Sequence, residues 1–137
     1  MNRMLHLACA ALILPPIAGI SHAESWNCRN KAVEISCGEG ECTVSRDHTP
    51  MAVTIFLSGD MSFCAYSGCW QGSATDILAT GQYLTVTGAR LRWTGTGAAS
   101  GESIAGSATV DRKNRTATVM IAGFAHPMTC ERNPASG

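Results

Sequence analysis

The sequence predicts a mostly β domain, a small antiparallel β-sandwich or barrel stapled by disulfides. Eight short segments rich in β-branched and aromatic residues are separated by turn residues, a spacing typical of such folds. Several of these segments alternate, so that in 83–86 Leu84 and Val86 point away from Tyr83 and Thr85. An even set of cysteines in the predicted exported chain supplies the staples.

The N-terminal segment predicts export. Arg3 precedes an apolar run over 5–20, and the small residues of "SHA" at 21–23 suit a signal peptidase. We expect residues 1–23 to be a cleaved secretory signal peptide and residues 24–137 to be a single β domain that is periplasmic or secreted. The run is short and broken by prolines, so no membrane span is predicted. Lipidation at Cys9 is the less favoured alternative, because His6 stands where a lipobox has Leu.

The cysteine spacing suggests a disulfide framework. Seven cysteines minus Cys9 leave six, which allow fifteen pairings. "CGEGEC" and "CAYSGC" share a four-residue insert that contains Gly, and a hairpin loop of that length would bring its two cysteines opposite each other. Redox and zinc sites remain the alternatives, but a redox dithiol more often spaces its cysteines by two residues, and export argues against free thiols. The preferred pairs are Cys37–Cys42, Cys64–Cys69 and Cys28–Cys130.

The predicted elements follow one another along the chain with polar turns between them. Turns are expected at 58–60, 87–88 and 111–115, and a surface loop at 94–101. A helical turn or two is expected at 72–80, where Ser73 or Thr75 could cap. The predicted strands lie at 33–36, 42–45, 51–57, 61–66, 82–88, 89–93, 102–110 and 116–123.

Composition and motifs exclude several classes of function. Lysine and arginine balance aspartate and glutamate at a net charge of +0, and no basic patch suggests a nucleic-acid partner. The sequence has no nucleophile elbow, metalloprotease helix, phosphate-binding loop or dinucleotide fingerprint. We therefore expect a non-enzyme that needs no cofactor.

Both histidines of the mature chain stand close to a proline and a methionine. Thioether and imidazole groups together suit Cu(I), so His48, Met51, His126 and Met128 form an alternative metal site. His126-Pro-Met128 resembles the HxM element of periplasmic copper chaperones, over three residues only. In the competing interpretation, the methionines fill gaps in the core and the histidines lie at strand ends.

A non-catalytic binding or inhibitor-like module is the favoured function. Tyr66 at a stapled turn could anchor a partner, with Trp70 beside it as a second contact; alternatively, the two rings pack on each other. "YLTVTG" at 83–88 resembles a motif of the periplasmic inhibitors of c-type lysozyme, but it lacks their lysine before the glycine. The likeness implies only that an exported β-domain of this size can present a loop to a partner. We expect a monomer that binds an unknown protein or envelope ligand.

Overall fold

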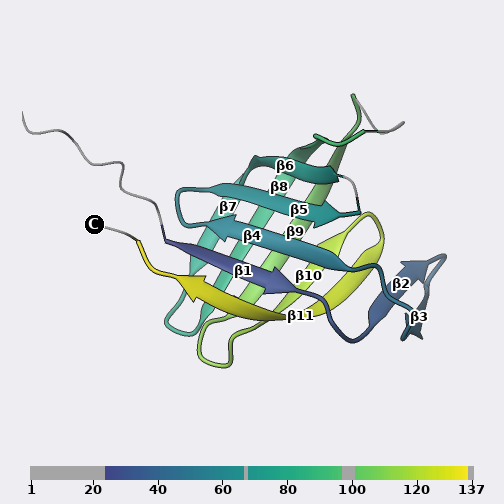
Figure 1. Ribbon diagram of the computed structural model, residues 1–137, viewed down its shortest axis with the longest axis horizontal. Helices are drawn as coiled ribbons and strands as arrows, with labels where there is room; N and C mark the ends of the chain where they lie inside the picture. The colour runs from purple at the N-terminus through teal and green to yellow at the C-terminus, as the bar shows by residue number, and fades with distance from the viewer. Residues whose placement is uncertain (1–23, 67, 97–100, 136–137) are drawn as a thin grey trace, which may run out of the picture.

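A computed structural model describes residues 24–66, 68–96 and 101–135, and these residues form an all-β fold (Figure 1). The fold is a closed antiparallel barrel with extra strands, which confirms the predicted fold class. Within the described ranges no helix is long and apolar enough to cross a membrane. The predicted signal peptide at 1–23 lies outside these ranges, as do Ser67 and residues 97–100 of the predicted surface loop.

Eight strands close the barrel, and each pairs antiparallel with its neighbours. The first and last of them in the chain complete the ring, with Cys28 opposite Cys130. The order around the ring is β1 (Ser25–Arg29), β4 (Met51–Phe56), β5 (Asp60–Ala65), β6 (Gly68–Ser73), β8 (Tyr83–Trp93), β9 (Ser103–Asp111), β10 (Thr116–Ile121) and β11 (Phe124–Asn133).

Three further strands lie outside the ring. β2 (Glu34–Gly38) and β3 (Glu41–Ser45) form a hairpin that projects from one end of the barrel, at the right of Figure 1. The hairpin is attached where β2 pairs with the start of β11. β7 (Asp76–Ala79) pairs with the first half of β8, whereas β6 pairs with its second half.

The core fills the interior of the barrel because alternate residues of each strand point inward. Leu84 and Val86 are buried as predicted, and Leu91 is buried while the flanking arginines stay exposed. Two glycines make room for the bulky side chains: a Cβ at Gly106 would lie 3.0 Å from Leu91 Cδ1, and one at Gly88 would lie 2.8 Å from Leu91 Cδ2. Glycine thus replaces side chains where the interior is already full.

Two predictions about local structure were wrong. The segment 72–80 forms the end of β6 and then β7, not a helical turn, because the edge of β8 offers backbone partners along 84–87. A helix this short is marginally stable in isolation, so the segment is more stable as a strand paired with β8. The expected turn at 87–88 is instead a register shift between Gly88 and Leu91 inside one continuous strand.

Three disulfides join the six cysteines in the pairs that the spacing favoured, and each links residues directly opposite each other on antiparallel strands. Cys28–Cys130 lies in the core and ties the two ends of the domain across the closing seam. Several disulfides in so small a domain are typical of proteins from an oxidising, extracellular environment.

Candidate functional site

The tip of the β5–β6 hairpin presents the most exposed large hydrophobic side chain of the described residues. Cys64 faces Cys69 and Ala65 faces Gly68, so the strand pairing continues into the four-residue insert. Tyr66 follows that pair with a φ of 54°, and its side chain is 86% exposed. A left-handed conformation costs a non-glycine residue about 1 kcal/mol or more. The adjacent disulfide helps to hold the backbone of Tyr66 in this conformation.

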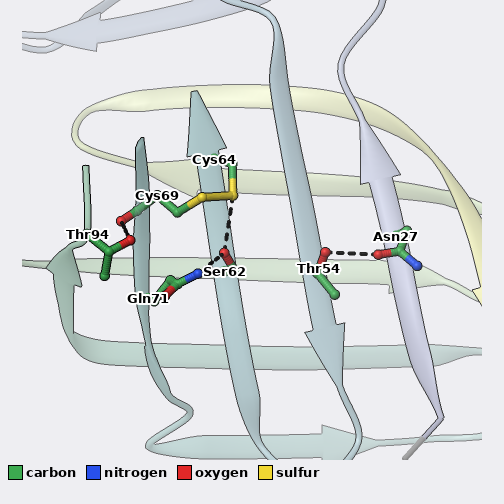
Figure 2. The surroundings of a disulfide bond; sticks show 7 residues. All are labelled: Asn27, Thr54, Ser62, Cys64, Cys69, Gln71 and Thr94. Atoms are coloured by element: carbon green, nitrogen blue, oxygen red, sulfur yellow. Dashed lines mark hydrogen bonds between the residues drawn. A yellow bond between two sulfur atoms is a disulfide. The ribbon is translucent and has the colours of Figure 1, made fainter. Parts of the chain in front are cut away.

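Polar contacts fix the strands beneath this tip (Figure 2). The backbone N–H and the hydroxyl of Thr94 both donate to the carbonyl of Cys69, at 2.9 and 3.0 Å. Across the β5–β6 pair, Gln71 Nε2 donates to Ser62 Oγ at 3.2 Å, and that oxygen lies 3.2 Å from Cys64 Sγ. These contacts hold in place the two strands that carry the tip, which reduces the conformational entropy lost when a partner binds there.

A groove of about 270 Å³ runs from Tyr66 to the end of β1, and two cations line it. Arg29 and Lys31 are both exposed, and no carboxylate lines the groove. Among the residues that the structure describes, neither cation has an ion-pair partner within 4.0 Å. The arrangement is an amphipathic aromatic ring beside two positive charges that form no ion pair among the described residues. Nothing in the sequence singled out Arg29 or Lys31, because the barrel alone brings them to the tip.

Trp70 packs against a second tryptophan and not against Tyr66. Its ring packs against Trp93, with ring centroids 5.4 Å apart and planes tilted by 57°. Trp70 is half-buried and packs against the core, so the alternative in which Tyr66 packs on it is wrong for this highly exposed tyrosine. Gly68 is part of the same arrangement, since a Cβ there would lie 2.3 Å from Trp93 Cζ2. No sequence pattern pointed to Gly68 or Trp93, and only the β6–β8 pairing identifies them.

The candidate copper ligands are partly brought together. His126 and Met128 both point into the barrel from β11 and are buried. Met51 is half-buried and lies with His126 around one small cavity. His48 is half-buried on the segment after β3, and its Nδ1 contacts the carbonyl oxygen of Arg46 at 3.2 Å. Within the described residues no group of three or more His, Cys, Asp or Glu side chains could hold a metal ion.

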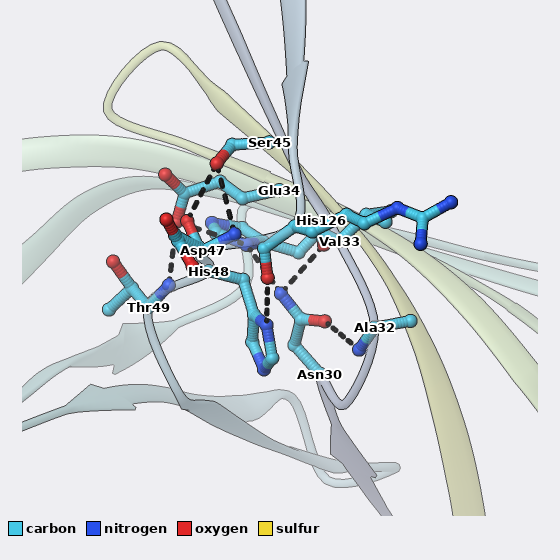
Figure 3. Close-up of polar contacts among 10 residues, drawn as sticks. Asn30, Ala32, Val33, Glu34, Ser45, Asp47, His48, Thr49 and His126 are labelled. Atoms are coloured by element: carbon cyan, nitrogen blue, oxygen red, sulfur yellow. Dashed lines mark hydrogen bonds and ion pairs between the residues drawn. The ribbon is translucent and has the colours of Figure 1, made fainter.

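His126 belongs to a polar cluster at the barrel end that carries the β2–β3 hairpin (Figure 3). Its Nδ1 lies 3.1 Å from Asn30 Nδ2 and 3.9 Å from Glu34 Oε2. Burial lowers the pKa of His126 below its ordinary value; Glu34 opposes this shift, and the charge of His48 adds to it. The Glu34 carboxylate also accepts the N–H of Thr49 at 3.1 Å, which ties the segment before β4 to β2.

The orientation of Asn30 decides which nitrogen of His126 carries the proton. Asn30 Oδ1 accepts the N–H of Ala32 at 3.2 Å, and its Nδ2 donates to the carbonyl of Val33 at 2.9 Å. An amide nitrogen can only donate, so Nδ1 of His126 must accept, and the neutral ring carries its proton on Nε2. A copper ion at Nε2 would need the opposite tautomer, and this tautomer counts against the copper hypothesis.

Comparisons with protein-family models, with curated proteins and with solved structures found no match for this chain.

Proposed function

We propose that this chain is a non-catalytic binding module, inhibitor-like in its mode of action, that works in the cell envelope or outside the cell. The observation that carries the proposal is the side chain of Tyr66, 86% exposed at the tip of a hairpin closed by a disulfide. Tyrosine is enriched among the residues that dominate binding energy, because it combines a large apolar area with a polar group. An exposed tyrosine contributes little to folding, so a role in recognition explains it best.

The charges beside the tip indicate the chemistry of the partner. Arg29 and Lys31 line the groove next to Tyr66 and have no acidic neighbour within 4.0 Å among the described residues. A partner with carboxylates on its surface would complement them and would be steered toward the groove. The proposed partner is therefore a protein with an acidic patch around a pocket that accepts the tyrosine ring.

The experiment captures partners from an exported-protein extract with the purified native protein. The Tyr66→Ala variant should lose the partner, and the Tyr83→Ala variant should retain it. Tyr83 is a matched control because it is the other tyrosine of the chain and is 47% exposed on β8, outside the groove. For a residue that dominates binding, the loss should be about 2 kcal/mol or more, roughly thirtyfold in Kd.

The charges are tested separately by salt and by substitution. Arg29→Glu with Lys31→Glu should slow association and reverse its dependence on ionic strength, so that added salt speeds binding, because the steering charges are reversed. A partner that binds Tyr66→Ala as tightly as the native protein would rule out the tip as the binding site.

A further inference from the structure

A small cavity opens at the end of the barrel beside the polar cluster of His126. Its volume is about 150 Å³, and it is distinct from the charged groove at Tyr66, although Met51 and Ala65 border both. Phe63, Ile121 and His126 are almost fully buried and form its floor. Trp70 and Phe124 complete an aromatic wall, and Phe124 stacks near His126 with centroids 6.2 Å apart.

One buried polar atom on this floor, Nε2 of His126, makes no hydrogen bond with the described residues. His126 is 1% exposed, and its Nε2 has no hydrogen-bond partner among the residues that the structure describes. Because Asn30 donates to Nδ1, this Nε2 carries the ring proton and is a buried donor. An unpaired buried donor is costly for a folded protein, so a group that accepts its proton would stabilise the site.

The size and charge of the cavity restrict the ligand. A cavity of about 150 Å³ walled mainly by apolar side chains is large enough for one six-membered ring. Glu34 lines the cavity and lies 3.9 Å from His126 Nδ1, so an anion would meet a carboxylate. Neutral rings are therefore favoured over carboxylates and phosphates.

We infer that the mouth of the barrel binds a small neutral ring compound with one hydrogen-bond acceptor, which takes the proton of His126 Nε2. The aromatic wall supplies contact area, as in small barrels that hold a single ligand, and the histidine selects for the acceptor. This inference does not depend on the proposed partner at Tyr66.

The test compares pyridine with benzene, two rings of the same shape that differ by one acceptor nitrogen. NMR titration of the native protein at neutral pH, followed at the Trp70 indole and the His126 ring, gives both affinities. Pyridine should bind about threefold to tenfold more tightly, the usual net effect of one neutral hydrogen bond. Equal affinities for the two rings, or no binding of either, would overturn the inference.

Variants and a direct measurement complete the test. His126→Phe keeps a ring at this position and should abolish the preference for pyridine, whereas His48→Gln should leave it unchanged, because His48 does not line the cavity. In case His126→Phe does not fold, the ring ¹⁵N shifts of the native protein report the tautomer directly. A proton on Nε2 that shifts when pyridine is added supports the site, and a proton on Nδ1 refutes it.

Discussion

Replacing Cys28 and Cys130 with alanine tests how the barrel is closed. Their disulfide joins β1 to β11 across a separation of 102 residues, whereas Cys64–Cys69 spans a separation of 5. Both bridges link facing residues of antiparallel strands, with Cα atoms 4.0 Å apart, so the local geometry is matched. The seam variant, in which Cys28 and Cys130 are alanine, and the hairpin variant, in which Cys64 and Cys69 are alanine, therefore differ mainly in the length of loop that each disulfide closes.

The loop lengths set the expected magnitudes. In the chain-entropy model, a loop of about 100 residues is worth about 4.7 kcal/mol of unfolding free energy, and one of about 5 residues about 2 kcal/mol. Cys28 and Cys130 are also 1% and 4% exposed, so removing their sulfurs from the core adds a packing cost on the order of 1 kcal/mol. The seam variant should therefore lose about 4 kcal/mol more than the hairpin variant.

Urea unfolding without reductant measures the difference. With a slope of about 1–3 kcal/mol per molar urea, the seam variant should unfold at least about 1 M below the hairpin variant. A Cys37→Ala, Cys42→Ala variant is the control, because its bridge also spans a separation of 5 and should behave like the hairpin variant. Equal losses at the seam and at the hairpin tip would refute the reasoning, as would peptide mapping that joins Cys28 to another cysteine.

Three further predictions concern other parts of the molecule. Because burial lowers the pKa of His126, the unfolded chain takes up a proton first as the pH falls below 6.5, and stability should drop there by up to about 1.4 kcal/mol per pH unit. The His126→Asn variant should lack this loss of stability at low pH. Identical pH profiles of urea unfolding for the variant and the native protein would contradict the prediction. The native protein should take up no stoichiometric Cu(I); uptake that His126→Ala with Met128→Ala abolishes would restore the copper hypothesis. N-terminal sequencing of the exported protein should begin at or near Glu24, and a retained Met1 or a lipid on Cys9 would exclude the predicted processing.

Local patterns in the sequence were sufficient for the strands that alternate and for the short disulfides. Leu84 and Val86 face the core because the period of a strand is two residues, whatever surrounds it. The cysteine pairs at 37–42 and 64–69 meet because a tight turn between two strands forces facing positions together. In both cases the information lies within a few residues of the chain.

Strands that depend on distant partners were missed. β1 has little alternation of its own and is held between β4 and β11. β11 contains Pro127, a residue type that is disfavoured inside a sheet. Pro127 is exposed on the outer face of β11, opposite Thr118 of β10. The sequence also suggested a helical turn at 72–80, because the edge of β8 that captures this segment cannot be read from the segment itself.

The sequence by itself determined an all-β domain and its two short disulfides, because each depends on local chain geometry. Only the tertiary structure decided what surrounds these features. Closure of the barrel places Arg29 beside Tyr66, and it brings Asn30 against His126, 96 residues away in the chain. That contact fixes the proton of the ring on Nε2, and so determines the chemistry of the cavity, because a tautomer is set by neighbours in space.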